Sequence, residues 1–233
     1  MLLSLAAPAV AAPLMPPDAG RTIGTRLSFD GLVDEAGNAL AEASERDAES
    51  GDDRPWIVSP MYTSCPHTCS AITNGVRSAL AESGLAESEY RALSFSFDPS
   101  ETAESLRVFR QRMRLPASWL TLRASDARAL ARLLDAMDFR TMQTADGEYQ
   151  HPNLVAVLSA DRRLAGYVFG VKPSSTELAN LVRSARDGIP GSAGWGMLLF
   201  FFAAIGLLVS TFVFVWLLVE RRSRPAVEAK SQL

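Results

Sequence analysis

Residues 62–70 read Tyr62-Thr63-Ser64-Cys65-Pro66-His67-Thr68-Cys69-Ser70 and hold both cysteines of this 233-residue chain. The short apolar run Trp56–Met61 precedes them, and apolar residues at helical spacing follow. This pattern places the two cysteines where a buried strand passes into a helix. Because the unpaired N–H groups and the dipole of a helix N-terminus favour a thiolate, the junction suits thiolate chemistry.

Composition and charge are those of an ordinary globular protein. Hydrophobic residues make up 48% of the chain and charged residues 21%, and the formal net charge is −3. The segment 21–188 has the length of one domain that can bury a core. A negative net charge without a basic patch indicates no nucleic-acid partner. Two cysteines four positions apart would close a very small loop, so a purely structural disulfide explains them poorly.

The N-terminal end, residues 1–20, is apolar and rich in small residues, which indicates a signal-peptide-like leader. Within it, Ala9-Val10-Ala11 fits a signal-peptidase site with cleavage before Ala12. The positively charged start of an ordinary signal peptide is missing. A disordered leader rich in alanine and proline is therefore the alternative interpretation.

The C-terminal end contains a long uncharged run, from Gly188 to Val219. It exceeds the ~20 apolar residues that a transmembrane helix needs, and Trp195 and Trp216 lie near its ends, as interfacial aromatic residues do. We therefore expect residues 189–219 to span a membrane. Basic residues are more numerous after the run than before it, which predicts a cytoplasmic tail at 220–233. The sequence thus predicts a bacterial inner-membrane protein with its soluble domain in the periplasm.

Between the two ends, segments with strand periodicity alternate with segments with helical periodicity. The predicted strands cover 26–29, 56–62, 91–97 and 119–122, with hairpins at 32–40 and 154–170. The predicted helices run from the second cysteine to Gly84 and over 101–113, 126–137 and 174–186; Ser100 or Thr102, Ser125 and Ser174 are their expected caps. The acidic stretch 42–54 is expected to be a solvated loop.

This order of elements predicts the fold class. Alternating strands and helices give an α/β protein with a partly parallel sheet, and the late hairpin adds antiparallel strands. With the cysteines at the first strand-to-helix junction, the prediction is a thioredoxin-like mixed sheet flanked by helices, plus one C-terminal transmembrane helix. The expected domains are 1–20, 21–188, 189–219 and 220–233.

Cys65 and Cys69 are the predicted catalytic or metal-binding residues. Thioredoxin-type redox motifs place two residues between the cysteines, whereas three stand here, which gives a wider bite that can hold one metal ion. Two thiolates rarely complete a site, and His67 and His151 are the only imidazoles of the chain. Pro152 stands where thioredoxin-like folds have a cis-proline that packs against the cysteine turn. We therefore expect His151 beside the sulfurs.

The predicted donor set favours copper. Soft thiolates select Cu(I), and imidazole suits both oxidation states, whereas a structural zinc site would need a fourth protein ligand. Met61 and Met142 could also bind copper, although core positions explain them more simply. The plain alternative is that the cysteines are two small buried residues and His151 is a surface or capping residue.

The cysteine stretch resembles the copper-binding motif of the Sco/SenC family, the thioredoxin-fold copper chaperones of cytochrome c oxidase assembly. Leu32–Gly37, Phe97-Asp98-Pro99 and His151 agree with the family in order, over about residues 26–186. The resemblance implies that Cys65, Cys69 and His151 bind one copper ion. It also implies that copper is delivered to the binuclear site of cytochrome oxidase subunit II, or to another copper-accepting membrane protein, or that this site is kept reduced.

Two departures from the family pattern stand out. His67 replaces the acidic residue that usually follows Cys-Pro, and the expected anchor is C-terminal rather than N-terminal. The predicted function is a membrane-anchored metallochaperone, with thiol–disulfide oxidoreductase activity on exported proteins as the alternative. The second function would use Cys65 and Cys69 as catalytic residues without His151. A peroxidase activity has no further signal in the sequence.

Overall fold

The computed structural model describes residues 14–40, 51–188, 210, 211 and 216. The chain divides into two compact units, Met1–Ile189 and Pro190–Leu233, and the fold described here is that of the first. Most of the predicted leader, the predicted membrane span apart from three residues, and the predicted tail lie outside the described residues. Among the residues that are described, no helix has the length and apolar character needed to cross a bilayer.

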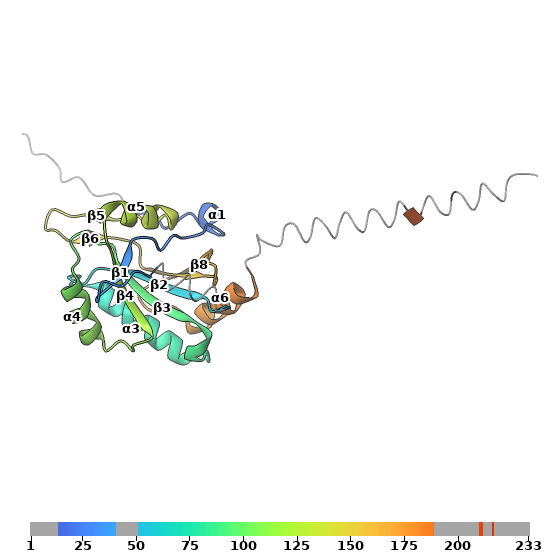
Figure 1. The fold of residues 1–233 in the computed structure, drawn as a ribbon, viewed down its shortest axis with the longest axis horizontal. Coiled ribbons are helices and arrows are strands. Elements are labelled where there is room, and N and C mark those ends of the chain that lie inside the picture. Colours follow the sequence, from blue (N-terminus) through green and yellow to red (C-terminus); the bar gives the residue numbers. More distant parts are fainter. Residues whose placement is uncertain (1–13, 41–50, 189–209, 212–215, 217–233) are drawn as a thin grey trace, which may run out of the picture. The chain divides into compact units, whose positions relative to one another are not determined.

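A six-stranded mixed sheet forms the centre of the domain (Figure 1). Its strands, in spatial order, are β1 (Leu32–Asp34), β4 (Trp119–Ala124), β3 (Arg91–Ser96), β2 (Trp56–Met61), β7 (Leu154–Leu158) and β8 (Leu164–Phe169). β2, β3 and β4 run parallel, while β1, β7 and β8 pair antiparallel with their neighbours. The predicted thioredoxin-like mixed sheet is therefore confirmed.

Helices cover both faces of the sheet, which explains why its central strands are buried throughout. The helices are α1 (Ala19–Thr22), α3 (Thr68–Glu82), α4 (Ala103–Met113), α5 (Ala127–Ala136) and α6 (Ser175–Asp187), with a 3₁₀ turn η1 at Glu87–Glu89. In Figure 1, α5 and α1 lie on one side of the sheet and α3 and α4 on the other; α6 contacts α3. Every residue of β2, β3 and β7 is buried, as expected for strands covered on both faces.

Several local predictions are confirmed and others are wrong. Thr102 and Ser174 cap α4 and α6. At α5, Asp126 and not Ser125 is the cap, because the Asp126 carboxylate accepts from two backbone N–H groups at the helix start. The predicted strand 26–29 is reduced to one bridge between Arg26 and Arg163. The predicted hairpin 32–40 is also reduced to one bridge, since β1 pairs with β4 instead.

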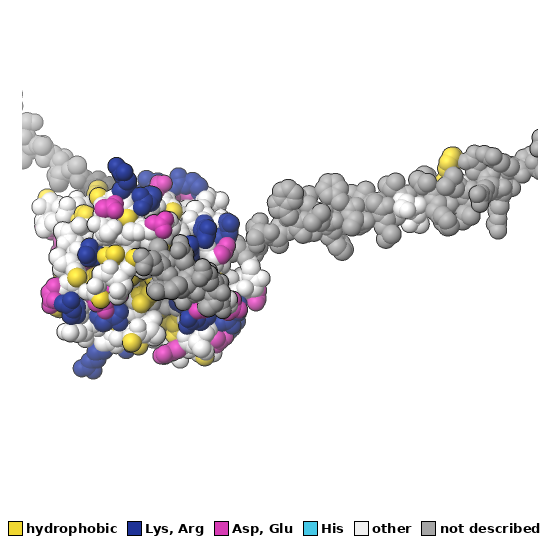
Figure 2. All heavy atoms as spheres, viewed as in Figure 1, with side chains coloured by type: hydrophobic (Ala, Val, Ile, Leu, Met, Phe, Trp, Pro, Cys, Tyr) yellow, Lys and Arg dark blue, Asp and Glu magenta, His cyan; other side chains and the backbone are white. Residues whose placement is uncertain are grey.

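A second, two-stranded sheet of β5 (Met142–Gln143) and β6 (Tyr149–Gln150) was not predicted from the sequence. Strands of two residues are too short to show an alternating pattern. This small hairpin leads directly into the segment that carries His151. On the face of the molecule seen in Figure 2, acidic and basic side chains are interspersed rather than gathered by sign.

The described end of the acidic stretch 42–54 is not simply solvated. Asp52 lies 2.6 Å from the Arg91 guanidinium and also pairs with Arg54. Arg91 is only 8% exposed, and its guanidinium lies over the Trp56 ring, 4.6 Å from the ring centre. The hydrogen bonds from Arg54 and, next, those from Arg91 hold the pKa of Asp52 well below its ordinary value, although burial opposes the shift. Asp52 therefore ties this stretch to the start of β3.

We expect Asp52→Asn to lower the free energy of unfolding by about 1–2 kcal/mol at pH 7, since charge-assisted hydrogen bonds are lost. The folded-state pKa lies below the unfolded one of about 3.9, so the carboxylate stabilises fully above that value. This contribution is lost as the pH falls through the folded pKa. Urea unfolding at pH 7 and pH 3 should show the difference from wild type narrowing in acid. Asp53→Asn, at the exposed neighbour, is the control, and a difference independent of pH would contradict the expectation.

Candidate metal centre

The two thiols lie at the N-terminal end of α3, as the sequence predicts. Cys65 is half-buried in the turn before the helix, and Cys69 lies buried in its first turn, 1% exposed. Both are free thiols. The backbone N–H of Cys69 donates to the Cys65 sulfur at 3.4 Å, so the chain places Cys65 against the open N–H groups of the helix. The two sulfurs therefore face the same small volume.

His151 joins the two sulfurs despite 82 residues of separation from Cys69. Its Nε2 lies 3.8 Å from the Cys69 sulfur, and the ligand atoms of Cys65, Cys69 and His151 lie within 4.8 Å of one another. The Nδ1 atom lies 3.1 Å from the carbonyl oxygen of Pro152. Because a carbonyl only accepts, this contact needs the hydrogen on Nδ1. Nε2 then presents its lone pair toward the thiols, as a metal-binding imidazole does.

The expected cis-proline is wrong, because the described residues contain no cis peptide bond and Pro152 is therefore trans. Aromatic rings surround His151 instead. The ring centres of Phe97, Phe139 and Tyr62 lie 5.0, 6.1 and 6.3 Å from that of His151. Such edge and tilted contacts restrain a ring in a buried place. Packing thus holds the imidazole where the sequence argument had invoked the proline.

The electrostatic environments of the two thiols differ. Burial opposes ionisation of Cys65, yet the backbone N–H groups of Cys69 and His67 outweigh it and hold the pKa of Cys65 below its ordinary value. Burial raises the pKa of Cys69 strongly, and the neighbouring Cys65 adds to this rise. Burial also lowers the pKa of His151, which favours the neutral imidazole that binds metals. The site therefore combines one thiol whose pKa is lowered with one whose pKa is raised.

Glu101 is a supporting residue that the sequence reasoning missed. Its carboxylate accepts from the Thr63 N–H at 3.0 Å, from the Thr63 hydroxyl at 2.7 Å and from the Ser96 hydroxyl at 2.6 Å. Arg112 donates to the Thr63 carbonyl at 3.1 Å. The segment before Cys65 is thereby fixed. A signal was available, since β2 and β3 are parallel neighbours and residues after both strands meet at one edge.

Tyr62 is a second residue that the sequence reasoning did not assign. Its ring lies between Phe97 and Tyr149, with ring centres 5.3 and 5.2 Å away, and its hydroxyl accepts from the Tyr149 N–H at 3.3 Å. Burial, followed by the two neighbouring thiols, raises the pKa of Tyr62 to about 12. Tyr62 is thus a neutral phenol that connects β2, the cysteine turn and β6.

The two candidate methionines have different outcomes. Met61 is fully buried at the end of β2, which confirms a core position. Met142 is 37% exposed, so its interpretation as a core residue is wrong. The reason is that β5 pairs only with β6, away from the main sheet.

The three donors have a spacing that fits a metal ion. In a tetrahedral site with thiolate and imidazole bonds of about 2.3 and about 2.0 Å, sulfur and nitrogen lie about 3.5 Å apart. The observed separation of 3.8 Å between the Cys69 sulfur and His151 Nε2 is close to this value. Small movements of the side chains would bring all three donors onto one ion. The geometry therefore agrees with a two-thiolate, one-imidazole metal site.

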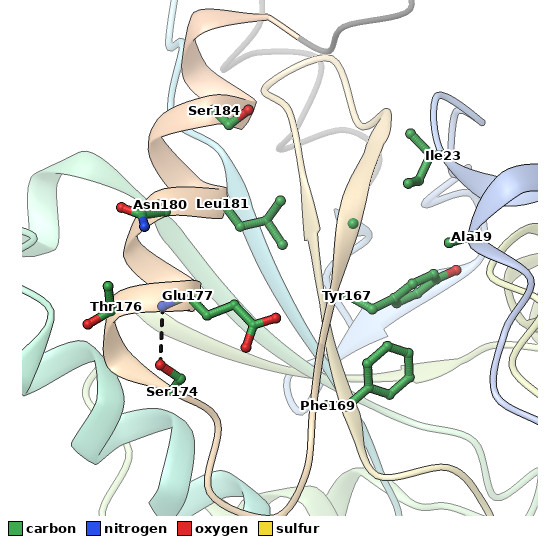
Figure 3. Close-up of a pocket in the computed structure, with 11 residues that line it drawn as sticks. Ala19, Ile23, Tyr167, Phe169, Ser174, Thr176, Glu177, Asn180, Leu181 and Ser184 are labelled. Carbon is green, nitrogen blue, oxygen red and sulfur yellow. Dashed lines mark hydrogen bonds between the residues drawn. The ribbon is translucent and has the colours of Figure 1, made fainter.

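A different groove is more apolar but lacks this chemistry (Figure 3). It has a volume of about 690 Å³ and lies along β8, α6 and α1. Figure 3 shows Tyr167 and Phe169 on one side and Leu181 and Glu177 of α6 on the other. None of the described residues that line it is a cysteine or a histidine. The site with convergent ligands is the smaller pocket beside Cys65 and His151, of about 390 Å³.

The fold and the site together define a thioredoxin-like protein with a candidate metal centre of two cysteines and one histidine. A family model described as SCO1/SenC matches residues 31–186. The chain therefore belongs to the SCO1/SenC family. A comparison with curated proteins gives no match.

Solved structures agree with this assignment. A crystal structure from Aquifex aeolicus VF5, described under electron transfer, has 32% identity and a TM-score of 0.63, covering 71% of this chain and 95% of that one. Bradyrhizobium japonicum ScoI with copper bound has 22% identity and a TM-score of 0.52, covering 69% and 98%. Yeast Sco1 with copper bound has 13% identity and a TM-score of 0.55, covering 73% and 92%. The last two likenesses concern the fold alone.

Proposed function

We propose that this protein binds one copper ion through Cys65, Cys69 and His151. The observation that carries the proposal is the convergence of these three donor atoms within 4.8 Å in a chain of the SCO1/SenC family. Two of the similar structures, from Bradyrhizobium japonicum and yeast, have copper bound. In this chain the two thiolates are soft enough for Cu(I), and the imidazole also suits Cu(II).

Copper fits the donor set better than zinc does. Structural zinc sites take four protein ligands, and the cluster found among the described residues has three. Cys65 and His151 are half-buried and both line the pocket of about 390 Å³, whereas Cys69 lies buried. We propose that copper enters and leaves past Cys65. This arrangement is that of a carrier, since the cargo can be reached from one side.

The proposed role is that of a copper chaperone. The chain would deliver copper to, or keep reduced, the binuclear copper site of cytochrome oxidase subunit II, as the family resemblance implies. The uncharged run 189–219 would anchor it in a bacterial inner membrane, with the domain in the periplasm and residues 220–233 in the cytoplasm. This placement would bring the copper site close to membrane-bound acceptors.

A second candidate function is thiol–disulfide exchange with an exported protein. The contrast between the Cys65 and Cys69 pKa values favours it, because a half-buried thiol with a lowered pKa suits attack and a buried thiol suits resolution. In that reaction Cys65 would attack the disulfide of the partner and form a mixed disulfide. Cys69 would then attack this mixed disulfide and release the partner as a dithiol. The domain would gain one disulfide, and the partner would gain two electrons and two protons. His151 would have no part in it.

Metal analysis of the full-length chain in detergent tests the proposed function. We expect one equivalent of Cu(I) or Cu(II) per chain after gel filtration, and with Cu(II) a visible sulfur-to-copper charge-transfer band. Titration with Zn(II) as the competing ion should displace little copper, because the site offers three donors. A chain that retains no copper, or that prefers zinc, would contradict the proposal while leaving the exchange function open.

A further inference from the structure

His67 occupies a position at which another residue type is expected. It is the N-cap residue of α3, where serine, threonine, aspartate or asparagine usually accepts a hydrogen bond from the helix start. The His67 side chain makes no such bond. Instead, its Nε2 lies 3.2 Å from the Glu148 carboxylate. The imidazole of His67 is thus directed away from its own helix and toward a different segment.

Glu148 stands in the turn between β5 and β6, and its backbone is held firmly. The carbonyl of Glu148 accepts from the Thr144 N–H at 2.7 Å and from the Thr144 hydroxyl at 2.9 Å. Gly147 precedes it with a φ of +86°, which a tight turn requires. Tyr149 follows, its N–H bonded to the Tyr62 hydroxyl. Glu148 is therefore a fixed point three residues before His151.

The contact between His67 and Glu148 joins the two segments that carry the proposed ligands. His67 lies between Cys65 and Cys69, and Glu148 lies on the approach to His151. All of these except Cys69 line the same pocket of about 390 Å³. We infer that His67 and Glu148 form a latch that holds the cysteine turn against the His151 segment and thereby slows the loss of bound copper. The inference rests on the proposed copper site, in which both are positioning residues.

The size of the effect follows from exposure. The His67 side chain is 69% exposed and that of Glu148 39%, so water weakens their attraction. Contacts of this kind change an equilibrium by at most about fivefold. His67 is not part of the ligand cluster found among the described residues, and its Nε2 is engaged by the carboxylate. Its effect on copper is therefore expected to pass through Glu148 rather than through direct binding.

A double-mutant cycle on the full-length chain tests the latch. His67→Ala and Glu148→Ala should each speed copper transfer to an excess of a Cu(I) chelator by about two- to fivefold. The double variant should be no faster than either single one, because both changes remove one interaction. Glu148→Gln keeps an accepting oxygen, so it should speed copper transfer less than Glu148→Ala does. The Cu(II) charge-transfer band should keep its position in all four variants, since the ligands remain.

Controls separate this proposal from the proposed function. Glu104→Ala removes an exposed ion pair with Arg107 on α4 and should leave the transfer rate unchanged. In the copper-free chain, amide hydrogen exchange at Tyr149 should rise equally in His67→Ala and Glu148→Ala, so the latch can be measured even if copper does not bind. Additive effects in the cycle, a His67→Ala effect well above that of Glu148→Ala, or unchanged rates and exchange would overturn the latch.

Discussion

Replacing either cysteine with serine is expected to lower copper affinity by about 100- to 1,000-fold. Structural zinc sites with four ligands bind with about 10–16 kcal/mol, so one ligand carries about 2.5–4 kcal/mol. A hydroxyl at position 65 or 69 is a poor donor for Cu(I), which prefers soft sulfur. Competition between the full-length chain and a Cu(I) chelator measures the loss. Serine is nearly isosteric with cysteine, so Cys65→Ser should leave the thermal unfolding midpoint close to that of wild type.

Ser64→Ala is the matched control for the cysteine variants, because it changes an exposed residue of the same turn. It should leave copper affinity unchanged. The two cysteine variants should also differ from each other in stability. Cys69→Ser places a hydroxyl in a position that is 1% exposed, so it should destabilise the domain more than Cys65→Ser. Copper affinity that survives either substitution would show that the ion binds elsewhere.

The chemistry of the site could be predicted because its residue types are rare in this chain. There are two cysteines and two histidines, so few combinations of soft and imidazole donors exist. The turn between a buried strand and a helix located the thiols, and the position of His151 before an apolar strand located the imidazole. The structure brings all three together. The long segments that form the sheet and its helices could be predicted because their apolar residues recur with a clear strand or helix period.

Supporting residues could not be predicted in the same way. Glu101 and Glu148 are two of 26 acidic residues; the parallel order of β2 and β3 indicates the sheet edge near Glu101, but no spacing marks which carboxylates face the site. Their roles depend on tertiary contacts, with Thr63 and with His67. The sheet of β5 and β6 was missed because its strands have two residues each. Such short strands are determined by their surroundings rather than by local propensity.

Pro152 shows how a correct position can rest on a wrong reason. The sequence argument placed His151 beside the thiols through an expected cis-proline, but the bond is trans. The imidazole reaches the thiols because Phe97, Phe139 and Tyr62 pack around it. Aromatic packing between distant segments leaves no local signature in a sequence. The membrane span at 189–219 stays a prediction, argued from the uncharged apolar run and from the tryptophans near its ends.

Changing His151 is the second large effect that we expect, and it separates the two candidate functions. His151→Ala should lower copper affinity by about 100-fold or more, by the same argument of one ligand in a small set. It also removes a ring from an aromatic cluster, which can lower stability by itself. His151→Phe keeps a ring in that place without a donor nitrogen. Loss of copper in both variants, with a normal unfolding midpoint in the phenylalanine variant, would assign the nitrogen to the metal.

The same two variants should retain thiol–disulfide exchange, because Cys65 and Cys69 are intact. Oxidation of the domain by a disulfide reagent such as oxidised glutathione, followed by thiol titration, should give one Cys65–Cys69 disulfide at a rate within about threefold of wild type. The pKa of Cys65 is set mainly by burial and by N–H groups of the α3 turn, and not by His151. Copper affinity and a Cu(II) spectrum unchanged in His151→Phe would reject the three-ligand site, because copper would then be bound without His151.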